Sequence, residues 1–124
     1  MGEEERLFFA DWPMLLPIYE RLREKLAQKY SQLRVKVSKT QISFYNRRMF
    51  AMVSLPWRKV KGRPKVYLLV SFGLPVCKEA SRIEQAVEAY ANRWTHHVVV
   101  QRVDEIDSEL LEWLDEAYSF SMVK

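Results

Sequence analysis

The sequence has little of three residue types that build common functional sites: cysteine, glycine and histidine. Its 124 residues include one Cys, three Gly and two His. A lone Cys77 cannot form an intramolecular disulfide or a cysteine-rich zinc site. Three glycines, one of them Gly2, are too few for a glycine-rich phosphate-binding loop. The sequence therefore favours none of these sites.

The two histidines are adjacent in the sequence, at His96 and His97. Neighbouring side chains on a strand point to opposite faces of the sheet, so the pair cannot bind one metal ion from a regular strand. We expect one of them to hydrogen-bond in the core beside Trp94 and the other to face the opposite surface. The sequence predicts no metal site.

Catalytic motifs are also lacking. No G-x-S-x-G or H-E-x-x-H pattern occurs, and no signature of a cysteine enzyme surrounds Cys77, which we expect to be a small buried apolar residue. The sequence gives no catalytic residue and no cofactor. It favours a non-enzymatic protein. An enzyme with an unrecognised His-dependent site ranks third, after the two binding functions described below.

Targeting and membrane signals are absent as well. Residues 1–6 contain three Glu and one Arg, the reverse of the positive start of a secretory signal. The most apolar stretch, residues 66–76, is interrupted by Ser71, Gly73 and Pro75, and it is shorter than the ~20 residues of a membrane-spanning helix. We expect a soluble, cytoplasmic protein with no membrane partner, which also suits a chain with one cysteine.

Charge is unevenly distributed along the chain. The net charge of +4 divides into a segment from Lys25 to Lys78 with thirteen Lys and Arg and no acid, and a segment from Val103 to Val123 with seven acids and no base. The first segment suits an anionic partner. Whether it is free to bind one depends on whether the acidic segment lies against it.

Hydrophobic periodicity predicts an α+β domain. Leu15, Ile18, Leu22 and Leu26 recur at helical spacing, which predicts a helix that begins between Pro13 and Pro17 and ends near Tyr30. Alternating residues predict strands at 34–38, 41–45, 49–55, 65–72 and 95–101, and helical spacing predicts further helices at 78–91 and 104–120.

These elements predict a single domain over residues 1–124, with a mainly antiparallel five-stranded sheet and N-terminal, middle and C-terminal helices (α-β-β-β-β-α-β-α). Strand 65–72 is apolar on both faces, which predicts a central position. Residues 46–48 predict a hairpin turn in which Asn46 can accept positive φ, and Asp107 is the predicted N-cap of the last helix.

Three segments carry a resemblance to a known family. They are KTQISF at residues 39–44, RWTHH at residues 93–97 and DSELLEWLDEAY at residues 107–118. Together they resemble the bacterial domain-of-unknown-function family numbered 5655 (DUF5655). The resemblance implies a small α+β domain that occurs in bacteria, and it brings no catalytic residue.

Polar and basic residues on the predicted strands form the main candidate site. One sheet face is expected to be polar and cationic, and we predict that it binds a small anionic ligand or a protein partner. The candidate ligand-binding residues are Arg34, Lys36, Gln41, Ser43, Tyr45, Tyr67, His96 and His97.

The alternative partner is nucleic acid, bound by the basic hairpin turn and loop. Lys and Arg would contact phosphates, and an exposed aromatic ring would stack on a base. The candidates are Arg47, Arg48, Trp57, Arg58, Lys59, Lys61, Arg63 and Lys65. The simpler interpretation, which we favour, is that these charges keep a sheet edge soluble.

Apolar residues on both faces of the central strands suggest a further surface. A ligand cleft or a dimer interface would be lined by Tyr67, Leu69, Ala51, Val53 and Leu55, unless the protein's own helices cover them, which is the simpler expectation. Both a monomer and a homodimer are consistent with the sequence.

Overall fold

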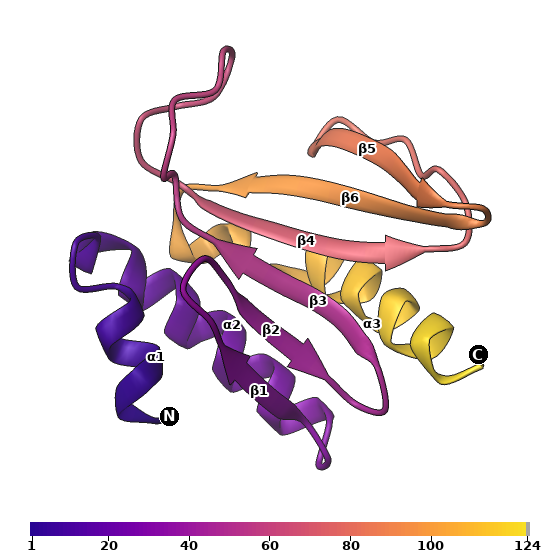
Figure 1. The fold of residues 1–124 in the computed structure, drawn as a ribbon, viewed down its shortest axis with the longest axis horizontal. Coiled ribbons are helices and arrows are strands. Elements are labelled where there is room, and N and C mark those ends of the chain that lie inside the picture. Colours follow the sequence, from indigo (N-terminus) through magenta and orange to yellow (C-terminus); the bar gives the residue numbers. More distant parts are fainter. Residues whose placement is uncertain (124) are drawn as a thin grey trace.

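The protein is an α+β domain, described here by a computed structural model of residues 1–123 (Figure 1). Short 3-10 turns at Pro13–Leu15 and Val103–Glu105 precede the two long helices. The helices are α1 (Glu3–Phe8), α2 (Leu16–Lys29) and α3 (Ser108–Met122). The strands are β1 (Arg34–Val37), β2 (Ile42–Tyr45), β3 (Met49–Ser54), β4 (Leu68–Leu74), β5 (Ile83–Tyr90) and β6 (Arg93–Val100).

The strands form one sheet in the order β1-β2-β3-β4-β6-β5, and every neighbouring pair is antiparallel. The predicted α+β class and antiparallel sheet are correct. β4 pairs with both β3 and β6, so the strand predicted to be central lies inside the sheet. Helix α1 was not predicted; its six residues are too few to show a helical period.

The predicted middle helix at residues 78–91 is wrong, because this segment contains the edge strand β5. The sheet therefore has six strands and not five. β5 contains two irregularities, at Ile83/Gln85 and Glu88/Tyr90. The first lets Ile83 pair with Val98 and Ala86 with His96, so two residues three apart lie on the same face. A bulge thus imitates helical spacing in the sequence.

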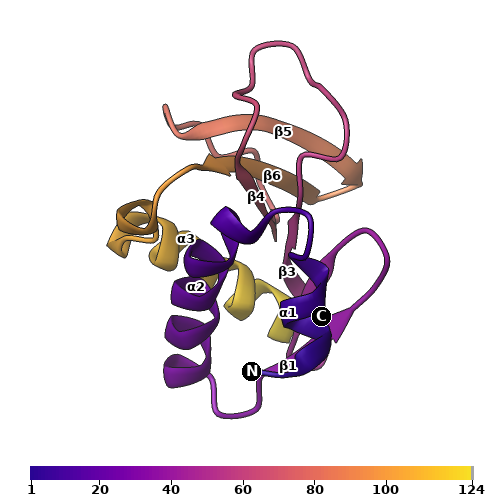
Figure 2. The same ribbon diagram turned by 90° about the vertical axis from the view of Figure 1, so that its left-hand side faces the viewer.

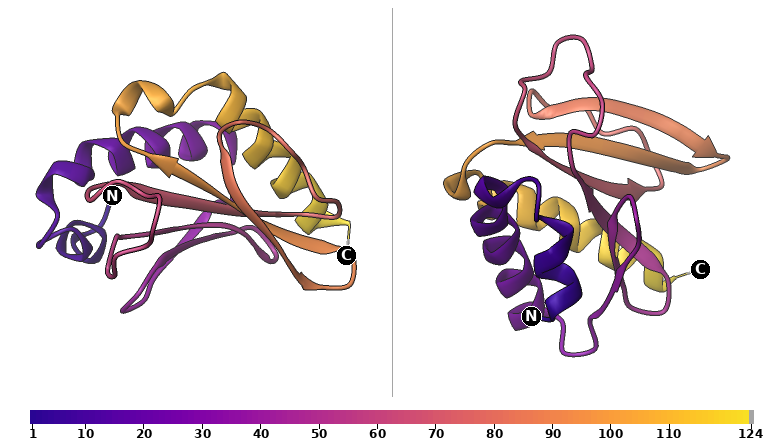
Figure 3. Two further views of the ribbon diagram at one scale, coloured as in Figure 1. Left: turned by 90° about the horizontal axis from the view of Figure 1, so that it is seen from above. Right: turned by 60° about the vertical axis from the view of Figure 1, so that its left-hand side comes forward.

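Helices α2 and α3 lie on the same side of the sheet (Figures 2 and 3). Their apolar faces are buried: Leu22, Leu26, Leu110 and Leu114 are each at most 1% exposed. They pack on side chains from one face of the strands, including Phe44 and Val70. We call this the covered face, and the opposite one the helix-free face.

The acidic helix α3 lies on the covered face. Its acids form ion pairs with cations near the two ends of the basic segment 25–78 or just beyond it. Asp115 pairs with Lys29, Glu116 with Lys78, and Asp107 with Arg82. None of its ion pairs involves a cation between residues 30 and 77 among the described residues. The acids of α3 therefore do not neutralise the basic residues of the helix-free face.

Within residues 1–123, no helix is long and apolar enough to cross a membrane.

The predicted N-cap of α3 is present, and it gives a first test. The Asp107 carboxylate accepts the Leu110 backbone N–H at 3.1 Å and a hydrogen bond from Arg82 at 2.7 Å. Asp107→Ala should lower the free energy of unfolding by about 1 kcal/mol in urea titrations, because it leaves a helix N–H unpaired. Asp104→Ala is the control: its exposed pair with Arg102 should contribute little. Equal losses in both variants would contradict the capping role.

Candidate functional site

A row of side chains crosses the helix-free face from one edge of the sheet to the other. Adjacent strands pair Lys36 with Ser43, Ser43 with Met52, Met52 with Ser71, Ser71 with His97, and His97 with Gln85. Directly paired residues share a face, so the candidates Lys36, Ser43 and His97 lie together on the helix-free face.

His96 lies on the covered face and is therefore separated from the other ligand-binding candidates. Its ring is fully buried and stacks on Phe72 with centroids 5.2 Å apart. Nε2 accepts the Lys78 backbone N–H at 2.9 Å, and Nδ1 lies 3.1 Å from the Trp94 carbonyl oxygen. Burial lowers the pKa of His96, which suits a neutral ring that accepts a hydrogen bond. This is the core histidine expected beside Trp94.

His97 lies on the helix-free face and contacts Ser71. The Ser71 Oγ lies 2.7 Å from Nδ1 of His97. Burial lowers the pKa of His97, and the nearby Arg63 lowers it further. A Ser–His pair can support nucleophilic catalysis, but Ser71 is only 2% exposed. The contact positions the His97 ring and leaves no accessible serine nucleophile.

Residues 56–67 between β3 and β4 form the basic loop, which projects beyond the sheet (Figure 1). Trp57 anchors its start, since the indole N–H donates to the Thr40 carbonyl oxygen at 3.3 Å. Gly62 has φ +88°, a conformation that favours glycine in a turn. Trp57 is still 51% exposed. The loop thus carries an accessible aromatic residue among cations.

Arg63 ties the basic loop to the edge strand β5. Its guanidinium pairs with Glu84 at 2.8 Å, lies 5.7 Å from the centre of the Tyr67 ring, and is only 9% exposed as a side chain. Its buried Nε has no hydrogen-bond partner among the described residues. The hydrogen bond to Glu84 raises the pKa of Arg63. Arg63 is therefore a fixed positive charge beside the helix-free face.

A cleft of about 480 Å³ lies between the basic loop and the helix-free face. Trp57, Arg58, Arg63 and Tyr67 line it from the loop, and Leu69 and Gln85 line it from the strands. It combines three nucleic-acid candidates with one ligand-binding candidate. We call it the basic-loop cleft.

Other candidates lie away from this cleft. Arg34 folds onto the β2–β3 turn, where its guanidinium donates to the Asn46 carbonyl oxygen at 2.6 Å and lies 5.8 Å from the centre of the Tyr45 ring. Gln41 donates to the Ser43 Oγ at 2.8 Å. Arg47 and Arg48 lie in that same turn, at the opposite end of β3 from the basic loop. The predicted nucleic-acid residues therefore divide between two ends of the sheet.

Two local predictions are wrong. Asn46 does not have positive φ; its side chain is buried and donates to the Tyr118 hydroxyl at 2.8 Å, so it links the turn to α3. Cys77 is exposed and not buried, because it follows the end of β4 in an irregular surface segment.

The apolar residues expected to line one surface divide between the two faces. Ala51 and Val53 belong to the core, in line with the simpler expectation that helices cover them, whereas Leu69 lines the basic-loop cleft. Sequence reasoning missed Glu84 and Gln85, because a helix was predicted there. Within residues 1–123, no group of three His, Cys, Asp or Glu side chains is placed to hold a metal ion.

The two histidines predict a loss of stability in mild acid. Both pKa values are lowered on folding, so below about pH 6.5 the unfolded chain binds protons that the folded protein resists. The free energy of unfolding should fall from pH 7 to pH 5.5, by at most about 1.4 kcal/mol per pH unit for each histidine. His96→Gln should be less stable at pH 7 and show a shallower pH dependence in urea titrations.

His97→Gln should keep the contribution of His96 and lose that of His97, so it should also show a shallower pH dependence than the native protein. A His96→Gln variant with the pH dependence of the native protein would contradict the assignment of His96 as the buried neutral ring.

The comparisons with known proteins give the family. No curated protein and no solved structure matches the sequence. Residues 8–121 match the family described as Domain of unknown function (DUF5655), a match that includes all six strands, α2 and most of α3. Because this match covers nearly the whole chain, the protein belongs to the DUF5655 family, as its sequence segments indicated.

Proposed function

We propose that the protein is a non-enzymatic binding module that recognises a small anionic ligand in the basic-loop cleft. One observation carries this proposal: Arg58 and Arg63 meet Trp57 and Tyr67 around one cleft, on the side of the sheet away from the acidic helix α3. Guanidinium groups bind phosphates and carboxylates through paired hydrogen bonds.

The cleft provides both parts of such a recognition site. Arg58 is exposed and makes no ion pair among the described residues, so its charge is available to a ligand. Arg63 is held in place by Glu84, which also offsets part of its charge. The half-exposed Trp57 offers a flat apolar surface, whereas Tyr67 is only 3% exposed and lies beside the Arg63 guanidinium. A volume of about 480 Å³ suits a small molecule.

This arrangement favours an anion with a flat ring, such as a nucleotide, over a simple inorganic ion. An acidic segment of a protein partner would meet the same charges. The rest of the helix-free face, from Lys36 to His97, extends the surface available to a larger ligand.

Comparing Arg58→Gln with Lys59→Gln tests whether binding depends on the cleft or only on the charge of the basic loop. A screen of nucleotides and small anions by thermal shift should find a stabilising ligand, whose affinity is then measured by calorimetry. Arg58→Gln should weaken binding by about tenfold or more, because a charge-assisted hydrogen bond contributes about 1.5–3 kcal/mol. The matched control is Lys59→Gln, which removes the same charge from a residue that does not line the cleft. Equal effects of the two substitutions would contradict the cleft.

Nucleic acid is the second candidate, favoured by the free cations of the basic loop. Arg58, Lys59, Lys61 and Lys65 are exposed and make no ion pair among residues 1–123. The half-exposed Trp57 stands beside them as a stacking platform. Arg47 and Arg48, at the other end of β3, would not join this surface.

A double charge reversal in the basic loop separates the two candidates. If nucleic acid is the partner, Lys59→Glu with Lys61→Glu should abolish retention on heparin or single-stranded DNA at low salt, because phosphate contacts dominate such binding. Arg21→Glu with Lys29→Glu, at two exposed positions of α2, is the control of equal charge. Unchanged retention, or equal loss in both variants, would exclude a specific role of the loop in binding nucleic acid.

A further inference from the structure

A second cavity lies at the opposite end of the sheet from the basic loop. Pairing between β3 and β4 ends at Ala51 and Phe72, and beyond this pair the two strands diverge in front of the last turns of α3 (Figure 1). A cavity of about 300 Å³ lies there, lined by Arg48, Met49, Tyr90, Arg93, Phe120 and Ser121. It shares no lining residue with the basic-loop cleft.

The absence of a side chain at Gly73 leaves room for the Arg93 guanidinium at this cavity. A Cβ on residue 73 would lie 2.6 Å from the guanidinium carbon of Arg93, closer than two such atoms can approach. The guanidinium also lies 6.0 Å from the centre of the Tyr90 ring. Glycine weakens the interior of a strand, and close approach of another group is a usual reason for it. Gly73 thus gives the Arg93 guanidinium its place.

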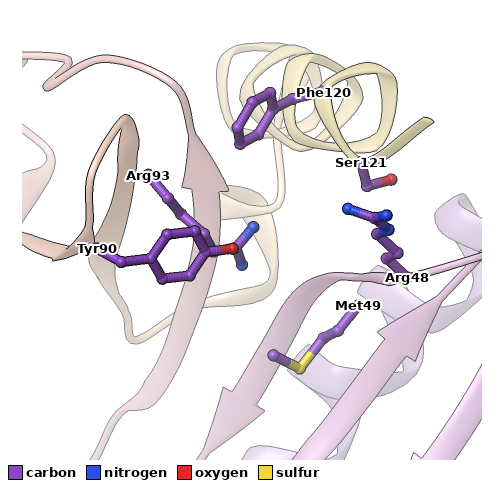
Figure 4. Close-up of a pocket in the computed structure, with 6 residues that line it drawn as sticks. All are labelled: Arg48, Met49, Tyr90, Arg93, Phe120 and Ser121. Atoms are coloured by element: carbon purple, nitrogen blue, oxygen red, sulfur yellow. The ribbon is translucent and has the colours of Figure 1, made fainter. Parts of the chain in front are cut away.

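Arg48 approaches the same cavity from the β2–β3 turn, with its guanidinium near Ser121 (Figure 4). Neither Arg48 nor Arg93 makes an ion pair with a carboxylate of residues 1–123. The C-terminal end of α3 contributes about half a negative charge nearby, which two guanidinium groups outweigh. The cavity is therefore electropositive.

The side chains around Arg48 and Arg93 indicate what kind of ligand would fit the cavity. Tyr90 is 58% exposed, and Met49 and Phe120 add apolar surface. A volume near 300 Å³ is at the lower limit for small-molecule sites. We propose that this cavity binds a small amphipathic anion, with a phosphate or carboxylate group between Arg48 and Arg93 and an apolar part against Met49 and Phe120.

Phenyl phosphate, benzoate and inorganic phosphate are the probes for this site. In titrations followed by amide chemical shifts, phenyl phosphate and benzoate should move the resonances of Tyr90, Arg93 and Ser121, with inorganic phosphate binding more weakly because it lacks the apolar part. Arg93→Gln should weaken binding of phenyl phosphate at least tenfold. Gly73→Ala should also weaken it severalfold, because the new methyl group displaces the guanidinium while its charge remains.

Arg47→Gln is the matched control, since Arg47 belongs to the same turn but does not line the cavity; its affinity should equal that of the native protein. The proposal is overturned if the probes leave these three resonances unmoved, or if Arg93→Gln and Gly73→Ala bind phenyl phosphate as tightly as the native protein. Circular dichroism checks folding of each variant, and Arg48→Gln on the exposed turn replaces any that fails to fold.

The proposals for this cavity and for the basic-loop cleft can be tested independently of each other. Arg58→Gln should leave phenyl phosphate binding at Tyr90 and Ser121 unchanged. Arg93→Gln should leave the ligand of the basic-loop cleft bound.

Discussion

Burial of α2 and α3 against one face of the sheet is the interaction on which the other features depend. The apolar sides of both helices, represented by Leu22 and Leu114, are fully removed from water, and apolar burial of this kind is the main favourable term in folding. An antiparallel sheet can leave its second face in water, provided that its residues there are polar or small. Apart from Met52, the row from Lys36 through Ser43 and Ser71 to His97 meets this condition.

The same packing separates the charges of the protein. α3 brings its acids to the covered side, where Lys29, Lys78 and Arg82 meet them. The basic loop leaves the sheet between β3 and β4 and forms no ion pair with these acids. Among residues 1–123, its one ion pair is with Glu84 of the edge strand β5. A protein with a modest net charge thus acquires a strongly cationic surface. This cationic surface follows from the separation of the charges and not from their total.

Hydrophobic periodicity predicted the helices and strands whose pattern of buried and exposed residues is regular along the chain. The amphipathic period gave α2 and α3, and the apolar strand gave the central β4. Prediction failed where pairing with another strand changes the period, as in β5, whose bulge places Ile83 and Ala86 on one face. It failed again at the turns: Asn92, and not Asn46, has the positive φ of 63°. Asn46 uses its side chain to reach Tyr118, a contact that no local pattern shows.

By itself, the sequence determined the fold class, the acid-free and base-free segments, the Asp107 cap and the placing of two adjacent histidines on opposite faces. These follow from spacing along one chain, because helical and strand periods are properties of the local backbone. Only the tertiary structure decided which histidine is buried, which cations share a cleft, and that Gly73 makes room for Arg93. Each of these depends on strand order, register and bulges, which join residues distant in sequence and leave no period within any one segment.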